Sequence, residues 1–384
     1  MLRPHRPETI TQNALMATPE QSPTPLAQRL AGEIAREGPM PFRDFMARCL
    51  YDPEHGYYAQ PARAVGRRGD FYTSVSVGPV FGELLAAFTA QAWEKWGRPE
   101  TFALMEQGAH DGHLMADVLE ALARHHPAAA QAALPSIIEP LAARRATQEK
   151  MLAGFPVGWS EALGPLPAAP ETGVFFANEL LDAFPVARLR FDGAQWREQL
   201  AALDDAGHFC WKDGGPPPPE ILTEIEKYRD PSAPLAAGYV TEYAPGLDEW
   251  AAQLAQALPR GTALLLDYGR EAEDYFAPHR TEGTLRGYRA HQRCDDPFAA
   301  PGETDLTADV NFTHLARAAE TAGFRALPAQ RQAAFLTRLA LPRLQAVPPP
   351  DAAWLRQFQT LTHPAHLGHS FQAIILEKPP APTR

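Results

Sequence analysis

Residues 102–112 read FALMEQGAHDG, and this stretch decides the fold. Phe102–Met105 is a continuous apolar run, which is typical of a strand that is buried on both faces. Gly108 and Gly112 bracket a turn, and apolar side chains follow it at helical spacing, at Leu114, Val118 and Leu122. A strand, a glycine turn and a helix in this order indicate an α/β protein whose turn brings backbone N–H groups close to a ligand.

Three more short apolar runs repeat this pattern further along the chain. They are Ser136–Ile138, Val174–Ala177 and Thr262–Leu266, and helical patterns separate them. Continuous apolar strands with helices between them predict a mostly parallel, doubly wound sheet that is covered on both faces. The alternating pattern between Val186 and Trp211 instead predicts an antiparallel insertion, and Gln372–Leu376 is expected to be the last strand.

The local signals divide the chain into a main α/β unit and several smaller parts. Thr24 and Pro25 are the residue types of a helix N-cap and first turn, so an N-terminal helical unit is expected to begin there. Proline clusters mark loops and ends. We expect a disordered tail at residues 1–24, a helical extension with a lid loop at 25–98, a core at 99–377 with an insertion at about 186–240, and a proline-rich tail at 378–384.

The composition of the 384 residues limits the classes of function. Hydrophobic residues make up 45% and charged residues 21%, which indicates an ordinary globular protein. The 35 basic and 46 acidic residues give a net charge of −11, which argues against nucleic acid as the partner. No apolar run reaches the roughly 18 residues of a membrane helix. Three scattered cysteines and the absence of an apolar signal region lead us to expect a cytoplasmic protein.

Acidic or amide residues follow each of the four buried strands. They are Glu106, Glu139, the pair Asn178-Glu179, and Asp267. The carboxyl ends of parallel strands share one edge of the sheet, where open α/β sheets bind their ligands. Each carboxylate alone also fits a helix cap, because helix N-termini favour negative charge. The four strand ends together predict a ligand cleft.

The glycine turn excludes two common nucleotide motifs. It lacks the G-x-G-x-x-G series of dinucleotide-binding proteins and the Gly-Lys-Ser/Thr end of a P-loop. Glu139 lies at the end of the second strand, where an acidic side chain binds ribose hydroxyls. The sequence therefore favours a nucleoside ligand without a pyrophosphate-binding fingerprint, and it disfavours a dehydrogenase.

Further motifs lie in one order along the chain and carry a family resemblance. They are residues 51–58 (YDPEHGYY), 69–74 (GDFYTS), 81–84 (FGEL), 138–140 (IEP), 178–185 (NELLDAFP), 266–269 (LDYG), 283–286 (GTLR) and 305–312 (DLTADVNF). With residues 102–112, they resemble the MidA-like family, which includes a mitochondrial complex I assembly factor with protein-arginine methyltransferase activity. The resemblance implies a Rossmann-like class I methyltransferase core and S-adenosyl-L-methionine as the cofactor.

The resemblance also implies roles for individual residues. The cofactor-binding set is expected to be Glu106, Gly108, His110, Gly112, Glu139, Asn178 and Asp70, with Asp70 on a lid loop. An arginine acceptor needs carboxylates that orient its guanidinium group. We therefore expect the catalytic residues to be Glu179, Asp182 and Asp267. The resemblance implies a protein substrate as the partner, with a respiratory-complex subunit as the class that the family suggests.

Two positions depart from the family pattern and keep other functions open. His110 replaces the middle glycine of the family's E-x-G-x-G-x-G loop, and Val75-Ser76 replaces a Pro-Glu pair after Thr73-Ser74. These departures motivate a first alternative, a catalytically weak or inactive relative that acts as a binding or assembly factor. A second alternative is a methyltransferase for a small molecule.

Residues outside these motifs give weaker signals. Arg286, His291 and Asp305 are expected to line a substrate channel or to pin a long loop. His363, His366 and His369 recur at three-residue spacing, but Pro364 and Gly368 interrupt any helix there. We therefore expect no metal site.

Overall fold

A nine-stranded sheet forms the centre of the molecule. The computed structural model describes residues 23–60, 73–165, 170–229, 232–289, 292–364, 367–368 and 371–380. The main strand order is β15-β17-β10-β5-β2-β3-β4, with β14 beside β10 and β16 beside β17. The strands are β2 (Phe102–Gln107), β3 (Ala133–Ile138), β4 (Gly158–Ser160), β5 (Thr172–Asn178), β10 (Arg260–Arg270), β14 (Val310–Asn311), β15 (Arg325–Ala326), β16 (Gln330–Arg331) and β17 (Phe371–Lys378).

The sheet is parallel from β4 to β10, and β17 then runs antiparallel to β10. Alternate residues of each strand enter different cores. Leu104 and Phe176 lie in one apolar cluster, whereas Met105 and Phe175 lie in the other. The sheet is therefore covered on both faces, and the predicted doubly wound α/β class is confirmed.

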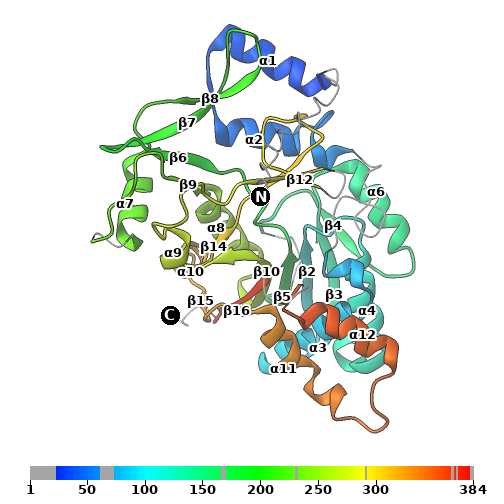
Figure 1. Cartoon of the computed structure of the whole chain (residues 1–384). Helices are drawn as coiled ribbons and strands as arrows, with labels where there is room; N and C mark the ends of the chain where they lie inside the picture. Colours follow the sequence, from blue (N-terminus) through cyan, green and yellow to red (C-terminus); the bar gives the residue numbers. More distant parts are fainter. Residues whose placement is uncertain are drawn as a thin grey trace, which may run out of the picture.

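Helices from distant parts of the chain cover the two faces (Figure 1). One face packs against α3 (Val80–Lys95), α4 (His113–His125), α5 (Pro127–Ala132), α11 (Gln332–Leu344) and α12 (Ala352–Thr362). The other face packs against α8 (Gly246–Ala257) and α10 (Phe312–Thr321). Two further helices are α6 (Ala142–Met151), which follows β3, and α9 (Ala272–Tyr275), which follows β10 and whose buried residues pack with those of the antiparallel insertion.

A second unit lies beyond one end of the main sheet (Figure 1). Its antiparallel sheet has the order β1-β7-β6-β9, with β8 beside β7. The strands are β1 (Met40–Pro41), β6 (Ala187–Phe191), β7 (Trp196–Leu203), β8 (Phe209–Asp213) and β9 (Val240–Tyr243), and the helices are α1 (Pro25–Glu37), α2 (Phe42–Tyr51) and α7 (Pro219–Tyr228). Since Met40 pairs with Ala201, the N-terminal segment and the insertion form one structure.

An aromatic cluster holds this second unit together. Phe298, from a later loop, contacts rings of α2 and β8, with centroid distances of 5.2 Å to Phe45 and 4.7 Å to Trp211. Gly302 of the same loop has φ +81°, and a Cβ there would lie 2.2 Å from the carbonyl oxygen of His55. The loop is therefore an integral part of the unit that α1 and α2 begin.

Short elements connect the two units. A three-stranded sheet has the order β12-β11-β13, and of two 3₁₀ turns the first contacts α2 whereas the second contacts α3 and α12. These elements are η1 (Tyr57–Ala59), η2 (Val75–Val77), β11 (Arg286–Arg289), β12 (Gln292–Cys294) and β13 (Asp305–Thr307). Among the described residues, no helix has the length and apolar character that crossing a membrane requires.

The sequence signals placed some boundaries well and others poorly. The N-cap at Thr24 is confirmed, because its Oγ1 accepts a hydrogen bond from the N–H of Ala27 at 3.0 Å. The proposed N-terminal extension at 25–98 differs from the packing, since α3 belongs to the core of the main sheet. Residues 1–22 and 381–384, which include most of both expected tails, lie outside the described residues.

Candidate active site

The topology itself creates a crevice. The chain continues from β2 to β3 and β4 on one side of the sheet, and then returns to β5 and β10 on the other side. Such a reversal opens a ligand crevice beyond the carboxyl ends of the two central strands. A cavity of about 900 Å³ lies there, lined by the loops that follow β2, β3 and β5. Its size suits a nucleoside ligand together with an acceptor group.

The glycine loop after β2 forms one wall of the cavity. Gly108, His110 and Gly112 have φ values of +79°, +50° and +90°, all in the left-handed region. A Cβ at Gly108 would lie 3.3 Å from Cδ1 of Leu180, so glycine keeps this wall open. His110 takes a conformation that L side chains rarely adopt, at the position where the family pattern has glycine.

Glu106 lies beneath the loop and is almost completely buried. Burial raises its pKa to about 8, and the nearby Asp111 adds to the rise. Its Oε2 has no hydrogen-bond partner. Asp111 pairs with His113 at 2.8 Å, and hydrogen bonds from His110 and His113 lower the pKa of Asp111 although burial acts to raise it. Glu106 therefore offers a free buried acceptor to the cavity.

Glu139 follows β3 and is held on both carboxylate oxygens. Oε1 accepts a hydrogen bond from the N–H of Leu141, and Oε2 accepts one from Nε2 of Gln148, both at 2.9 Å. Burial raises the pKa of this carboxyl group, and the two hydrogen bonds act to lower it. The side chain is thus fixed in orientation while it lines the cavity.

Asn178 and Glu179 end β5 on the opposite side of the crevice. Glu179 has φ +54°, which is a strained conformation for a residue with a side chain. Asn178 donates a hydrogen bond from Nδ2 to Oε1 of Glu179 at 2.8 Å, while the Oδ1 atom of Asn178 is buried without a partner. Burial, followed by the nearby Asp182, raises the pKa of Glu179 to about 8.

Asp182 lines the same cavity and is also buried. Burial raises its pKa to about 7, against the lowering effect of a backbone hydrogen bond and of the positive charge on Arg286. Two carboxyl groups with raised pKa values therefore face one space. Carboxyl groups with raised pKa values are frequent at functional sites. A cationic ligand can supply the positive partner that these groups do not have in the free protein.

Asp267 does not line the cavity, in contrast to the other three predicted strand ends. Its Oδ2 accepts hydrogen bonds from the N–H groups of Leu180, Leu181 and Asp182 at 3.2, 2.8 and 3.2 Å. Burial and the charge of Asp182 raise its pKa, and the bond from Leu181 opposes that rise. Asp267 thus holds the loop that carries Glu179 and Asp182, and it does not face the cavity as the predicted catalytic role requires.

The wall of the cavity opposite the sheet comes from the N-terminal segment and the last motif. The sequence alone left the role of these residues open. Tyr51 and Tyr58 pack together with a centroid distance of 5.5 Å, and both line the cavity. Tyr51 donates to the carbonyl oxygen of Ala183, and Tyr58 donates to Asp305 at 3.1 Å. The YDPEHGYY motif signalled the family but not this location, because only the fold brings it over the crevice.

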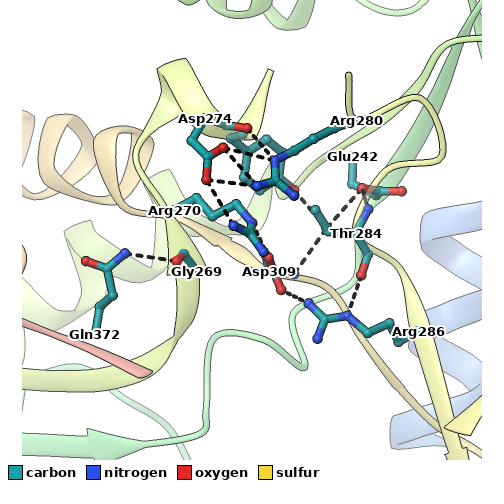
Figure 2. A network of polar contacts seen from close by, with 10 residues as sticks. Glu242, Gly269, Arg270, Asp274, Arg280, Thr284, Arg286, Asp309 and Gln372 are labelled. Atoms are coloured by element: carbon teal, nitrogen blue, oxygen red, sulfur yellow. Dashed lines mark hydrogen bonds and ion pairs between the residues drawn. The ribbon is translucent and has the colours of Figure 1, made fainter. Parts of the chain in front are cut away.

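Figure 2 shows the polar network that supports Arg286 at the cavity wall. Asp309 pairs with Arg286, and its Oδ2 also accepts a hydrogen bond from Nε of Arg270 at 2.8 Å. Thr284 connects the network to the buried Glu242, which accepts from the N–H of Thr284 at 2.7 Å. Since Asp309 balances the charge of Arg286, this arginine does not fully neutralise Asp182.

Several expected residues cannot be placed in the site. Asp70 and His291 lie outside the described residues, as do His366 and His369. In the described part of the chain, no group of three or more histidine, cysteine, aspartate or glutamate residues has an arrangement that suits a metal ion.

The cavity fits S-adenosyl-L-methionine in its chemistry. This cofactor has an amino group and ribose hydroxyls, which donate hydrogen bonds, and the cavity offers the unpartnered acceptors Glu106 Oε2 and Asn178 Oδ1. The open loop at Gly108 leaves room for the backbone to approach a ligand. Class I S-adenosyl-L-methionine-dependent methyltransferases have a doubly wound sheet with such a crevice, an arrangement that they share with other nucleotide-binding folds.

Comparisons with known proteins identify the family. The family described as "Putative S-adenosyl-L-methionine-dependent methyltransferase" matches residues 84–330, and the chain belongs to it. A crystal structure from Burkholderia thailandensis bound to S-adenosyl-homocysteine is 32% identical, covers 92% of both chains and superposes with a TM-score of 0.81. The predicted cofactor and enzyme class are therefore confirmed.

Curated relatives match most of this chain at lower identity. The Drosophila melanogaster protein is named "Protein arginine methyltransferase NDUFAF7 homolog, mitochondrial" and is 27% identical over 91% of this chain and 84% of its own length. The human "Protein arginine methyltransferase NDUFAF7, mitochondrial" is 26% identical over 79% of this chain and 70% of its own length. The prediction of a cytoplasmic location is wrong by this comparison, since these relatives are named as mitochondrial proteins.

Proposed function

We propose that this methyltransferase transfers a methyl group to an arginine side chain of a protein. The observation that carries the proposal is the pair of buried carboxyl groups, Glu179 and Asp182, in one cavity. No basic side chain forms an ion pair with either of them in the described part of the chain. The names of the curated relatives support the same acceptor.

A guanidinium group complements this pair of carboxyl groups in both charge and shape. It stays protonated because its pKa lies above about 12, and its planar donors pair well with carboxylates. Binding this cation would favour the ionised forms of Glu179 and Asp182, which burial disfavours in the free protein. The two carboxylates would orient the guanidinium, and one of them would accept the proton that the attacking nitrogen loses.

The tyrosines above the crevice also favour a cationic acceptor. Faces of aromatic rings attract cations, and Tyr51 and Tyr58 line the cavity on the side of Asp182. Tyr58 also donates to Asp305, which adds a third carboxylate to this part of the cavity. Aromatic and acidic groups together suit a guanidinium better than an anionic or an apolar acceptor.

The remaining cavity residues would hold the cofactor. The loop from Gly108 to Gly112 would hold its methionine portion, Glu139 its ribose hydroxyls, and Glu106 and Asn178 its other donors. When bound, S-adenosyl-L-methionine supplies an electrophilic methyl group on a positively charged sulfur. The surrounding side chains exclude water from the acceptor nitrogen.

The partner is proposed to be a protein, because the second unit places Tyr51 of α2 and Tyr58 of η1 beside the crevice. A subunit of a respiratory complex, which the family resemblance implies, is the first class of partner to test. Incubation with radiolabelled S-adenosyl-L-methionine and such subunits, followed by mass spectrometry, should reveal methylated arginine.

Glu179→Gln tests the proposal directly. The amide keeps the shape of the side chain but cannot carry charge, so methyl transfer should fall by at least about 100-fold. Calorimetry should show S-adenosyl-homocysteine affinity within about threefold of the wild-type value.

Glu149→Gln on the exposed face of α6 provides a matched control, and it should transfer methyl groups normally. Wild-type activity in Glu179→Gln would remove this residue from the reaction. An inactive binding factor would instead show no methylated arginine even with the wild-type protein and saturating cofactor.

A further inference from the structure

Gln148 is a completely buried side chain on α6 that touches the walls of the cavity from behind. It is not exposed to the cavity itself. Its Nε2 atom donates to the carbonyl oxygen of His110 at 3.1 Å and to Oε2 of Glu139 at 2.9 Å. One amide group therefore joins the glycine loop after β2 to the carboxylate after β3.

Trp159 fixes the orientation of this amide. Its indole Nε1 can only donate a hydrogen bond, and it donates to Oε1 of Gln148 at 3.1 Å. The amide oxygen must therefore face Trp159, and the amide nitrogen must face Glu139 and His110. Both hydrogens on Nε2 are used, so no rotation of the amide would preserve the three bonds.

The backbone around Gln148 is arranged for close contact with the loop. A Cβ at Gly112 would lie 3.5 Å from Cα of Gln148 and 3.2 Å from Cδ1 of Leu152. Glycine at this position lets α6 approach the loop closely. One turn earlier on the same helix face, Arg144 donates from Nε to the carbonyl oxygen of Tyr58 at 3.1 Å. Thus α6 holds both the loop and the tyrosine wall.

We propose that Gln148 is a positioning residue for the cofactor, which holds the carboxylate of Glu139 toward the ribose hydroxyls and fixes its distance from the glycine loop. The inference rests on the ribose-binding role proposed above for Glu139. Without the Nε2 donor, Oε2 of Glu139 would lose its partner, and the carboxylate would be held only by the N–H of Leu141 on Oε1. The ribose hydroxyls would then meet a mobile acceptor in place of an oriented one.

Gln148→Leu tests this inference, because leucine fills similar space without a donor. Calorimetry with the whole protein should show about 10–100-fold weaker binding of S-adenosyl-homocysteine, the range expected when a hydrogen bond to a charged group is lost. An analogue without the 2′- and 3′-hydroxyls should bind the variant and the wild type within about threefold, because it makes no use of the oriented carboxylate. Glu149→Gln, the next residue on the exposed side of α6, is the matched control.

Glu139→Ala separates the two assumptions. If Glu139→Ala leaves S-adenosyl-homocysteine affinity unchanged, the ribose-binding role itself is wrong. If Glu139→Ala weakens binding but Gln148→Leu does not, only the positioning role of Gln148 is overturned. If Gln148→Leu weakens the binding of S-adenosyl-homocysteine and of the analogue without the ribose hydroxyls equally, the positioning role is also overturned, because general distortion of the cavity would then be the cause.

Trp159→Phe keeps the proposal testable if Gln148→Leu does not fold. This change removes the bond that orients the amide and leaves Gln148 in place. It should weaken the binding of S-adenosyl-homocysteine by a smaller factor, about 2–5-fold. The binding of the analogue without the 2′- and 3′-hydroxyls should again stay unchanged. Unchanged binding of both ligands would count against the proposal.

Discussion

Glu179 and Asp182 are carboxylic acids that burial holds partly protonated at neutral pH. With pKa values of about 8 and about 7 in the free protein, both are ionised only in alkaline solution. A cationic acceptor requires the ionised forms. We therefore expect kcat/KM for the arginine acceptor to rise by at least about tenfold between pH 6 and pH 9, because this ratio reports the ionisation of the free enzyme.

Binding of S-adenosyl-homocysteine over the same pH range is the control for this profile. Its affinity should change less than kcat/KM, and Asp182→Asn should alter the shape of the profile. A profile that is flat, or that falls with rising pH, would contradict the role proposed for the two carboxylates.

His110 is a second residue with a measurable consequence. Its φ of +50° costs free energy for a residue with a side chain, and its Nδ1 lies 3.7 Å from Oδ1 of Asp111, too far for a strong hydrogen bond. His110→Gly should therefore increase the free energy of unfolding by about 0.5–1 kcal/mol, measured by chemical denaturation. Lower stability would show that the imidazole makes contacts that outweigh the strain.

Individual residues also show what a sequence can and cannot predict. Glu106, Glu139, Asn178 and Glu179 were predicted because each comes at the end of an apolar run in the sequence, and all four line one cavity. Asp267 satisfied the same rule, but its carboxylate turns away to bind three backbone N–H groups. Gln148 gave no signal, because a glutamine in a polar helix has no pattern that marks it as buried.

The loop between β5 and Ala183 depends on one carboxylate from the neighbouring strand. Asp267→Asn leaves a single acceptor oxygen where the wild type has two, so several of the four backbone N–H bonds are lost or weakened. We expect the free energy of unfolding to fall by about 1–3 kcal/mol and methyl transfer to fall with it.

Thermal denaturation and an activity assay on the same preparation check this prediction. Glu179→Gln should lose activity without losing stability, whereas Asp267→Asn should lose both. Full activity together with full stability in Asp267→Asn would contradict the positioning role.

The helices and strands that could be predicted are those whose own residue pattern shows that they are buried. Elements whose burial depends on partners far away in the sequence could not be predicted. Strands β2, β5 and β10 appear in the sequence as apolar runs, since both faces of each strand are covered. The helices α7, α11 and α12 were not predicted, because prolines near them mark loops and because their packing partners are distant in sequence. The pairing of β1 with β7 has no local signal at all.

At the scale of the whole molecule, Phe298 joins the N-terminal helices to the antiparallel sheet. Phe298→Ala should destabilise that unit by about 3–5 kcal/mol, as is typical of a deleted buried aromatic ring. We expect a first unfolding transition at lower denaturant concentration, a higher KM for the protein acceptor, and S-adenosyl-homocysteine affinity within about threefold of wild type.

Phe324→Ala is the matched control. Phe324 is buried to a similar degree, but it lies in the apolar cluster between the main sheet and the helices α8 and α10. It should destabilise the main unit and leave the KM of the acceptor unchanged. A single transition in Phe298→Ala at the wild-type denaturant concentration would show that the two units do not depend on this ring.

Because Met40 pairs with Ala201, strand β1 cannot complete its sheet until the chain has been synthesised to that residue. Strand β1 leaves the ribosome long before its partner, and at 5–20 residues per second the wait is roughly 8–30 s. During that interval the residues of the antiparallel sheet that pack on Leu30, Phe42 and Phe45 of α1 and α2 have not yet been synthesised. Phe298 arrives later still. The N-terminal helices therefore need a chaperone, or each other, until most of the protein has been synthesised.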